Sequence, residues 1–515
     1  MNTPPEDGRA RALEPAVVIP ALAAKMLIHL AAATRYGYFR DELYYLACAD
    51  RLAWGYVDHP PLSIAVLALV RAVLGDSLPA LRLVPALAGA LAIVFTVAVA
   101  ARMGAGRLGQ ALAAAAMLAA PMFAGIAGFY SMNSLDLVFW TCGAWLVVRA
   151  LDGEPRAWPL LGLVLGLGLL NKVSLLWFGG GLAAGLLLTP ARHHLRTRGP
   201  WVAAALALAL FSPHLLWQMG NGWPTLEFMR NATAFKMATR GVGAFTADMA
   251  LVMNPATLPL WLGGLAFLLV GREGARWRAL GVWFVAIFLV LALPGTSRTQ
   301  YISPAFPPLF AAGAVALESF AARRRAWRWL PRVLLAVLLA SGALFAPLAA
   351  ALFPVETYIA YARALGLAPA SEERKSVGEL PQHFADMFGW EEMAQAVAEV
   401  HGRLSPQEQA TAVVFAQNYG EAGALEHFGR DLGLPPVISG HNSYWLWGPR
   451  GGGQGPVIIL GGDAPDHRAA FASVEEAGRT ACRYCMPYER DLPIFVARGL
   501  RRPLAEVWPR VKHYD

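Results

Sequence analysis

Long apolar segments dominate the first 353 residues of this 515-residue chain. A helix needs about 20 predominantly apolar residues to cross a bilayer, and several of the segments are shorter than that. The stretch between Trp158 and Thr189 also admits other divisions. The pattern predicts a polytopic α-helical membrane domain over residues 16–353, with spans at Ala16–Thr34, Leu81–Met103, Leu108–Phe129, Ser131–Leu151, Trp158–Leu170, Ser174–Thr189, Trp201–Met219, Ala256–Gly271, Leu280–Pro294, Ser303–Phe320 and Trp329–Phe353.

Two polar loops interrupt this apolar region. The first, Arg35–Leu62, is rich in acidic and aromatic residues, and a helical spacing of apolar residues runs over Glu42–Leu52. A second helix, Leu62–Leu74, is predicted after a double proline. Both helices are too short to span, so we expect them to lie along the membrane interface. The second loop, Gly220–Pro255, is long enough to act as a lid.

The pattern changes at Pro354. The long apolar runs disappear, and glycine, proline and charged residues become more frequent. Short strand-like runs alternate with helical stretches, which predicts a mixed α/β domain over residues 354–515. The strand-like runs are Ala412–Ala416, Pro456–Leu460 and Ile494–Ala497, and the helical stretches are Trp390–His401 and Gln417–Phe428.

Composition and charge fit this division. The chain is 57% hydrophobic and only 15% charged, which is too apolar for an ordinary soluble enzyme. The formal net charge is +8, but the basic residues are concentrated in the loops assigned to the cytosol, as the positive-inside rule expects. We therefore expect no nucleic-acid partner, a cytosolic tail over residues 1–15, and an extracytoplasmic C-terminal domain.

The cysteines suggest no strong metal site. Cys482 and Cys485 form a CxxC motif, and no second ligand pair follows it. An extracytoplasmic disulfide or two free thiols are favoured over half of a metal site. Cys48 and Cys142 are isolated in the sequence.

Asp41 and Glu42 are the sharpest candidates for chemistry. Adjacent acids at the start of a helix also have a structural explanation, because carboxylates favour a helix N-terminus. However, Asp58 and His59 follow closely, just before the double proline. Two acidic motifs that flank one interfacial helix can converge on a pocket where a carboxylate takes a proton from a hydroxyl or amine.

Two further candidates lie in the predicted spans. Asp136 is one turn inside a span, and an intramembrane acid indicates function unless a basic neighbour pairs with it. Lys172 interrupts apolar sequence at the outer end of another span. It either contacts a ligand or extends its ammonium group to the interface.

Four charged or aromatic residues stand out in the outside loops. Arg298 and Tyr301 lie in a short loop, where a lone arginine suggests an anion such as a lipid phosphate, or simply lipid anchoring. Glu227 and Arg230, in the second polar loop, either contact substrate or pair with each other at helical spacing.

The C-terminal domain contains two segments rich in amides, acids, histidine and aromatics. They read QNYGEAGALEHFG and SGHNSYWLWGP. Aromatic and amide side chains are typical of sugar-binding surfaces, but an ordinary small-domain core and its turns contain them too.

These motifs, in this order, resemble the GT-C superfamily of polytopic glycosyltransferases. The nearest branches are the protein O-mannosyltransferases and the lipid A aminoarabinose transferases, and the resemblance covers roughly residues 15–350. It is carried by FRDELYY in the first loop, DHPPL after the interfacial helix, SLDLVFW in a span, and TQYISPAFP near the last spans.

The resemblance implies a sugar donor linked to a polyprenyl or undecaprenyl phosphate, and a location in a bacterial inner membrane. Asp41 would be the base and Glu42 its neighbour, with Asp58 and His59 beside them. Arg298 and Tyr301 would lie near the donor phosphate.

The chain departs from the aminoarabinose branch at two positions. That branch has a glutamate-lysine pair where this chain has Asp58-His59, and a histidine where this chain has Phe228. A metal site and a lipid A acceptor are therefore not carried over.

The expected reaction is a metal-independent, inverting displacement in which cations stabilise the departing phosphate and a carboxylate deprotonates the acceptor. The acceptor is an envelope glycan, lipid or protein. A secondary transporter and a non-catalytic glycan-binding membrane protein remain alternatives.

Overall fold

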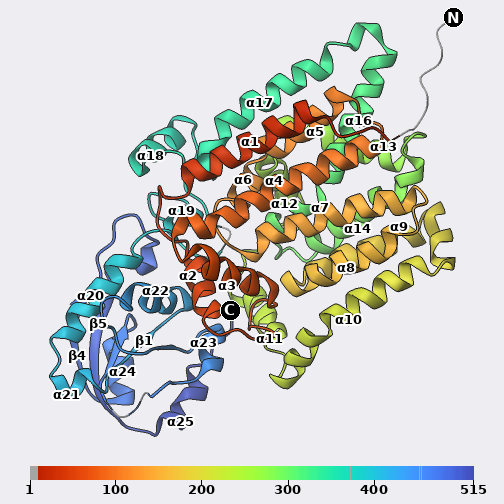
Figure 1. Cartoon of the computed structure of the whole chain (residues 1–515). Coiled ribbons are helices and arrows are strands. Elements are labelled where there is room, and N and C mark those ends of the chain that lie inside the picture. The colour runs from red at the N-terminus through yellow and green to blue at the C-terminus, as the bar shows by residue number, and fades with distance from the viewer. Residues whose placement is uncertain (1–9, 372, 452, 454) are drawn as a thin grey trace, which may run out of the picture. The chain divides into compact units, whose positions relative to one another are not determined.

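The computed structural model describes residues 10–371, 373–451, 453 and 455–515, so most of the predicted cytosolic tail lies outside the described residues. The chain forms two compact units, each assembled from segments that are separate in the sequence (Figure 1). Unit 1 comprises Met1–Arg35, Pro79–Leu215 and Thr239–Pro354, and unit 2 comprises Tyr36–Leu78, Leu216–Ala238 and Val355–Asp515.

In its described residues, unit 1 consists of helices and the loops that connect them. Its long apolar runs satisfy their backbone polar groups within helices, which is what a hydrocarbon environment requires. The helices are α1 (Pro15–Ala32), α4 (Leu78–Arg102), α5 (Arg107–Ala119), α6 (Pro121–Ile126), α7 (Met132–Leu151), α8 (Ala157–Asn171), α9 (Leu175–Leu187), α10 (Gly199–Gly220), α12 (Val242–Val252), α13 (Leu258–Leu269), α14 (Arg278–Ala292), α15 (Thr299–Ile302), α16 (Pro307–Arg323) and α17 (Leu330–Ala349).

The predicted spans correspond to these helices, but the count of eleven spans is not confirmed. Among the described residues, six helices are long and apolar enough to cross a membrane, and the number rises to nine if each bent helix pair counts as one span. A proline explains why one predicted span is divided into two helices. The predicted span Leu108–Phe129 is divided between α5 and α6 at Pro121, because proline has no backbone N–H with which to continue a helix.

Small residues set the closest helix packing in unit 1. A Cβ atom added to Gly264 on α13 would overlap the carbonyl oxygen of Leu309, and one added to Gly313 on α16 would overlap the carbonyl oxygen of Leu260. The α13 and α16 backbones therefore touch, as is common for helices that pack inside membranes.

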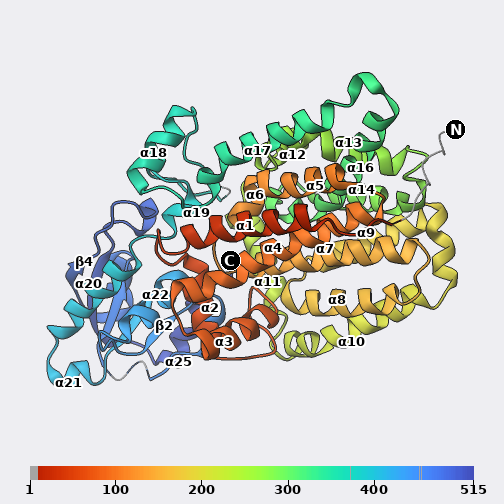
Figure 2. The ribbon, with the colours of Figure 1, turned by 45° about the horizontal axis from the view of Figure 1, so that its top comes forward.

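Unit 2 joins both polar loops to the chain from Val355 onward. Both ribbon views place α2 (Arg40–Ala49), from the first loop, beside α22 (Tyr419–Gly429) (Figures 1 and 2). The other helices are α3 (Leu62–Leu74), α11 (Pro224–Asn231), α18 (Val355–Ala364), α19 (Gln382–Ala385), α20 (Trp390–Gly402), α21 (Pro406–Gln409), α23 (Asn442–Trp447), α24 (Ala464–Ala470) and α25 (Leu504–Val507).

A five-stranded mixed sheet with the order β2-β1-β3-β5-β4 forms the centre of the C-terminal part of unit 2. Strands β2, β1 and β3 are parallel, whereas β5 runs antiparallel to both β3 and β4. The strands are β1 (Val413–Ala416), β2 (Val437–Ser439), β3 (Val457–Leu460), β4 (Phe471–Arg479) and β5 (Pro493–Leu500). The predicted mixed α/β architecture is present, with two strands, β2 and β4, that the sequence pattern did not indicate.

Both short helices predicted in the first loop are present. Helix α2 begins at Arg40, two residues before the predicted start, and α3 has the predicted bounds. The buried carboxylate of Glu42 accepts the backbone N–H of Phe39 at 2.8 Å, which satisfies one of the free donors at the N-terminus of α2. Helix α3 starts directly after Pro60 and Pro61, since proline is well suited to a first helical turn.

Candidate active site

Asp41 lies in the first turn of α2 and points its carboxylate toward α22. Its Oδ1 accepts a hydrogen bond from the Tyr419 hydroxyl at 2.9 Å and lies 3.7 Å from Arg40 Nε. The Asp41 side chain is 32% exposed, so one side of the carboxylate remains open to a substrate.

Glu42 has a different environment, although it is adjacent in sequence. Neighbouring residues on a helix point about 100° apart. Glu42 is fully buried and caps the N-terminus of α2 through Phe39. The geometry therefore distinguishes the two acids: Asp41 is accessible, and Glu42 holds the helix start.

Asp58 lies on the loop between α2 and α3. Its Oδ1 accepts a hydrogen bond from the Tyr44 hydroxyl at 2.9 Å, and the same hydroxyl lies 2.7 Å from Ser443 Oγ at the start of α23. Burial raises the pKa of the Asp58 carboxyl, although His59 and Tyr44 oppose this effect.

Two tyrosines join these acids into one site. The rings of Tyr44 and Tyr419 lie 4.8 Å apart, and each hydroxyl is bonded to one of the two aspartates. Burial raises the pKa of both phenols well above the ordinary value, so both remain protonated donors at neutral pH. The structure thus brings together Asp41 and Asp58, as the sequence pattern suggested.

His59 is fully enclosed beside this site. Its Nδ1 lies 3.1 Å from the Pro60 carbonyl oxygen, and its ring packs against Tyr45 and Tyr56 at 4.7 and 4.8 Å. Its Nε2 lies 3.9 Å from Asp58 Oδ1. His59 therefore supports the position of Asp58 from the protein interior.

Arg40 anchors the start of α2 in an acidic environment. Its guanidinium lies 3.8 Å from both Glu373 and Asp386, and it donates a hydrogen bond to the Tyr488 hydroxyl at 3.1 Å. The Arg40 backbone N–H also donates to the Asp386 carbonyl oxygen at 3.0 Å. Burial raises the pKa of the Asp386 carboxyl to about 6, with Arg40 acting in the opposite direction.

The C-terminal end of α2 is tied to α22 by an ion pair. The guanidinium of Arg51 donates two hydrogen bonds to Glu426, at 3.0 and 2.7 Å. The hydroxyl of Tyr444 donates to the same carboxylate at 2.9 Å. A bidentate pair of this kind fixes orientation as well as distance.

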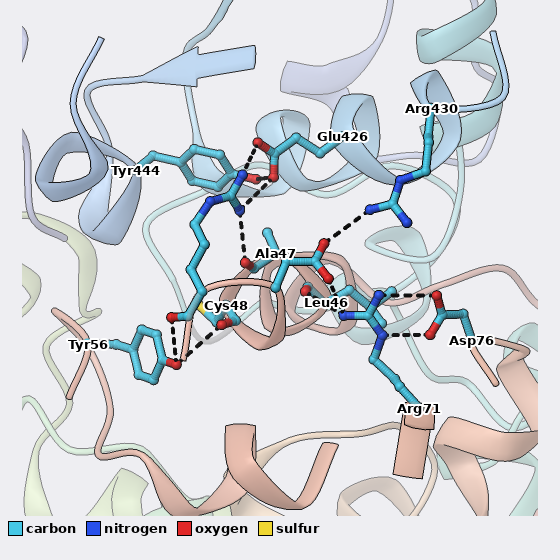
Figure 3. A network of polar contacts seen from close by, with 11 residues as sticks. Leu46, Ala47, Cys48, Tyr56, Arg71, Asp76, Glu426, Arg430 and Tyr444 are labelled. Carbon is cyan, nitrogen blue, oxygen red and sulfur yellow. Dashed lines mark hydrogen bonds and ion pairs between the residues drawn. The ribbon is translucent and has the colours of Figure 1, made fainter. Parts of the chain in front are cut away.

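A second network joins the same end of α2 to α3. Asp50 accepts hydrogen bonds from Arg71 at 2.8 Å and from Arg430 at 3.1 Å. Arg71 also binds Asp76, as Figure 3 shows. Both ends of α2 are therefore fixed, which sets the position of Asp41.

The second polar loop contributes Glu227 and Arg230 on α11. Glu227 Oε2 accepts an ion-paired hydrogen bond from Lys512 Nζ at 2.7 Å. Arg230 is exposed. The pairing of Glu227 is thus with Lys512 rather than with Arg230.

A separate polar group lies in unit 1. The Ser174 hydroxyl donates to the Asp136 carboxylate, with its Oγ 2.8 and 2.9 Å from the two carboxylate oxygens, and Lys172 Nζ lies 3.5 Å from the same carboxylate. Lys172 also donates to Asn133 Oδ1 at 2.8 Å and lies 5.3 Å from the ring centroid of Tyr301. Three predicted site residues, Asp136, Lys172 and Tyr301, therefore lie together.

Arg298 is half-buried and directly precedes α15, which carries Tyr301. Its carbonyl oxygen accepts the Tyr301 N–H at 3.1 Å. The backbone thus holds Arg298 close to the group formed by Asp136, Lys172 and Tyr301.

One cluster in the described part of the chain has the composition of a metal site: His441, His513 and Asp515. Its hydrogen bonds do not favour a metal. His441 Nδ1 accepts the Tyr419 N–H at 3.3 Å, so in the neutral ring the proton is on Nε2, which lies 3.0 Å from the Asp515 carbonyl oxygen. That tautomer leaves no lone pair on Nε2 for a metal ion.

The CxxC motif forms a disulfide between Cys482 and Cys485. This outcome matches one of the two thiol arrangements favoured by the sequence.

Tyr419 and Ser443 are the residues whose part in the site the sequence did not reveal. Both lie in the two C-terminal segments that stood out for their aromatic and amide side chains. Their partners, Asp41 and Tyr44, are 378 and 399 residues away in the chain. The only signal available was the composition of those segments.

Comparisons with known proteins agree with this architecture. The sequence profile of the family described as dolichyl-phosphate-mannose-protein mannosyltransferase matches residues 58–217. Among solved structures, the chain is similar to ArnT from Cupriavidus metallidurans bound to undecaprenyl phosphate, with 15% identity over 94% of this chain and 98% of that chain, and a TM-score of 0.61. The apo state of the same protein gives 15% identity, coverage of 93% and 97%, and a TM-score of 0.59. No curated protein matches the chain.

The predicted fold class, a polytopic α-helical membrane domain with a mixed α/β domain, is confirmed by this similarity. The chain has the ArnT fold, and its resemblance to GT-C glycosyltransferases of the protein O-mannosyltransferase and aminoarabinose transferase branch is confirmed.

Proposed function

We propose that this chain is a membrane glycosyltransferase that moves a sugar from a polyprenyl-phosphate donor to an envelope glycan, lipid or protein. Two comparisons support the donor class: ArnT, which shares the fold, has been crystallised with undecaprenyl phosphate, and the matching family is named for a dolichyl-phosphate sugar. The protein would lie in a bacterial inner membrane with its N-terminus in the cytosol and unit 2 on the periplasmic side.

The observation that carries the proposal is the connection of Asp41 and Asp58 through the hydroxyls of two neighbouring tyrosines, Tyr419 and Tyr44. Asp41 is the more accessible acid and is the base that removes a proton from the acceptor hydroxyl or amine. Asp58, with its raised pKa and its contact with His59, contributes to the choice of acceptor. Attack on the face opposite the phosphate gives inversion in a single displacement.

The cationic residues of unit 1 suit the departing phosphate. Lys172 and Arg298 would stabilise the charge that develops on the phosphate oxygens, and Tyr301 lies beside the Lys172 ammonium. Asp136 would orient Lys172 through their 3.5 Å contact. Glu227 and Arg230, on α11, would bind other parts of the substrates. The reaction is expected to need no metal, so activity should persist in EDTA.

The test uses purified full-length protein in nanodiscs with a panel of undecaprenyl-phosphate-linked hexoses and pentoses. An envelope extract serves as the acceptor, and mass spectrometry detects released undecaprenyl phosphate, the product common to every donor. We expect release with at least one donor, and a loss of about 10²–10⁴-fold in Asp41→Asn, the usual range for a general base.

Asp431→Asn is the matched control, because it removes an exposed aspartate from the same unit. Equal rates for the wild type and Asp41→Asn would exclude Asp41 as the base. Proton- or sodium-coupled solute uptake by the wild type, without transfer, would instead indicate a transporter.

A further inference from the structure

Tyr419 lies in the C-terminal α/β part of unit 2 and contacts the proposed base. We propose that Tyr419 is a positioning residue: its hydroxyl holds Oδ1 of Asp41, so that Oδ2 is presented to the acceptor. The inference rests on the proposed function for the assignment of Asp41. It makes the C-terminal domain part of the catalytic site rather than an accessory binding module.

The contacts of Asp41 are one-sided. Oδ1 receives the Tyr419 hydroxyl at 2.9 Å and is the atom nearest to Arg40, at 3.7 Å. Residues in the described ranges give Oδ2 no hydrogen bond. Contacts on one oxygen restrict the rotation of the carboxylate and favour one direction for the lone pairs of the other oxygen.

Tyr419 is itself held on several sides. It is the first residue of α22, its N–H donates to His441 Nδ1 at 3.3 Å, and its ring lies 4.8 Å from the rings of both His441 and Tyr44. Only 7% of the residue is exposed. The hydroxyl therefore has little freedom to leave Asp41.

Glycines fix the approach of α22 to α2. A Cβ atom added to Gly423 would lie 2.8 Å from the Leu43 carbonyl carbon, and one added to Gly420 would overlap the Arg40 side chain. The two helices meet at a distance that only glycine permits at these positions. This close packing sets the reach of Tyr419 to Asp41.

The protonation state of Tyr419 agrees with a positioning role and not with a role in proton transfer. Burial keeps the pKa of Tyr419 well above 10, so the phenol donates throughout the working pH range. In the reaction, Asp41 takes the proton of the acceptor hydroxyl or amine while the bond from the sugar to the phosphate oxygen breaks. The electron pair of that bond goes to the phosphate, the acceptor atom bonds to the sugar carbon, and the Tyr419 proton stays in place.

The inference predicts a specific change in the pH profile. A hydrogen bond to a carboxylate favours its ionised form, so removing the bond moves the acid limb of the rate profile to higher pH. The other titratable groups around Asp41 are Arg40 on α2, Asp58 on the following loop and Asp386 after α19. These groups are the same in the wild type and in a variant that lacks only the Tyr419 hydroxyl. A difference between the two pH profiles therefore results from the loss of that hydroxyl.

The experiment compares wild type and Tyr419→Phe in nanodiscs, with undecaprenyl phosphate release measured from pH 5 to pH 9. We expect kcat to fall about 10–30-fold, which is the loss expected from removing one hydrogen bond to a charged group. The KM for the donor should stay within about twofold of the wild-type value. The acid limb should move to higher pH. Replacing Tyr419 with 3-fluorotyrosine, a more acidic donor of nearly the same shape, should move the acid limb down.

Tyr444→Phe is the matched control, because it removes a buried hydroxyl that donates to a different carboxylate, Glu426. Its acid limb should match the wild type. A fall in the rate of Tyr419→Phe with an unchanged pH profile would mean a purely structural role, and an unchanged rate would also overturn the inference.

Failure of the inference and failure of the proposed function are distinguishable. An inactive Asp41→Asn with an unaffected Tyr419→Phe would overturn only the role of Tyr419. A fully active Asp41→Asn, or a wild type that releases no undecaprenyl phosphate, would overturn both. In the double variant, loss of Tyr419 should add nothing to the loss of Asp41.

Discussion

At the scale of single residues, the acids of unit 2 show how environment assigns roles. Asp41 and Glu42 are adjacent, yet one is accessible and the other caps a helix from a fully buried position. The sequence pattern predicted that Asp41 and Asp58 converge, because both flank a short helix, and in the structure the Tyr44 and Tyr419 hydroxyls each bind one of these acids. The sequence pattern could not identify Tyr419. Its hydrogen bond to Asp41 joins residues 378 positions apart, and such a contact produces no local sequence pattern.

Buried carboxyls near this site should make stability depend on pH. Glu489 and Glu421 share the amide of Asn418, at 3.0 and 2.8 Å, and both are buried. Burial raises the pKa of Glu489 to about 7 and that of Glu421 well above its ordinary value. The folded protein therefore binds more protons than the unfolded chain in the range from about pH 4.5 to 7.

Stability should consequently fall as pH rises through 7. Glu489→Gln mimics the protonated form, so we expect the drop in Tm between pH 5 and pH 8 to shrink by several degrees, corresponding to about 2–3 kcal/mol. Differential scanning fluorimetry at both pH values provides the measurement. Glu392→Gln, at an exposed position, should behave as wild type. An unchanged pH dependence in Glu489→Gln would contradict the buried, protonated pair.

Lys172 offers a second test at the residue scale. Its ammonium lies between Asp136, Asn133 and the Tyr301 ring, which fits a partner for a lipid phosphate. Lys172→Gln should weaken binding of undecaprenyl phosphate by about tenfold, equivalent to about 1.4 kcal/mol. Microscale thermophoresis gives the Kd.

The control for that measurement is Arg196→Gln, which removes an exposed basic residue of the same unit. Its Kd should equal that of the wild type. If Lys172→Gln binds undecaprenyl phosphate as tightly as the wild type, Lys172 does not bind the phosphate and has only a structural role in pairing with Asp136.

At the scale of elements, helices were easier to predict than strands. The helices α3 and α8 match their predicted segments closely because long apolar periodicity dominates there. Strand β2 has only three residues, all buried, and β4 at the sheet edge is largely exposed along its length. Neither presents the alternation of apolar and polar residues that marks a half-buried strand.

The α13–α16 contact gives a prediction at this scale. Gly313 leaves no space for a side chain against the Leu260 carbonyl, so Gly313→Val should force the helices apart and lower Tm by several degrees. Gly263→Ala is the control, because a Cβ at Gly263 meets no atom within 4 Å. Equal melting temperatures for Gly313→Val and the wild type, measured in detergent, would argue against this packing.

At the scale of the whole molecule, the distribution of basic loops predicts a membrane orientation. Unit 2 is expected outside and the arginine-rich loop between α16 and α17 inside. A cysteine introduced at the exposed Asp466 should react with a membrane-impermeant maleimide in intact cells, whereas one at the exposed Arg324 should react only after lysis. The unaltered chain measures background labelling from its own thiols. The reverse pattern would invert the proposed orientation.

The interleaved segments of unit 2 have a consequence for biosynthesis. Residues 36–78 leave the ribosome early, but Tyr419 and Ser443, which complete the surroundings of Asp41 and Tyr44, are made several hundred residues later. Residues 36–78 therefore lack their partners Tyr419 and Ser443 while the intervening helices are being made. A loop in that state exposes unpaired charges and lacks an assembled site. Under the proposed function, the nascent chain therefore cannot yet use lipid-linked sugar. The proposed activity would begin only when the last segment has folded onto the first.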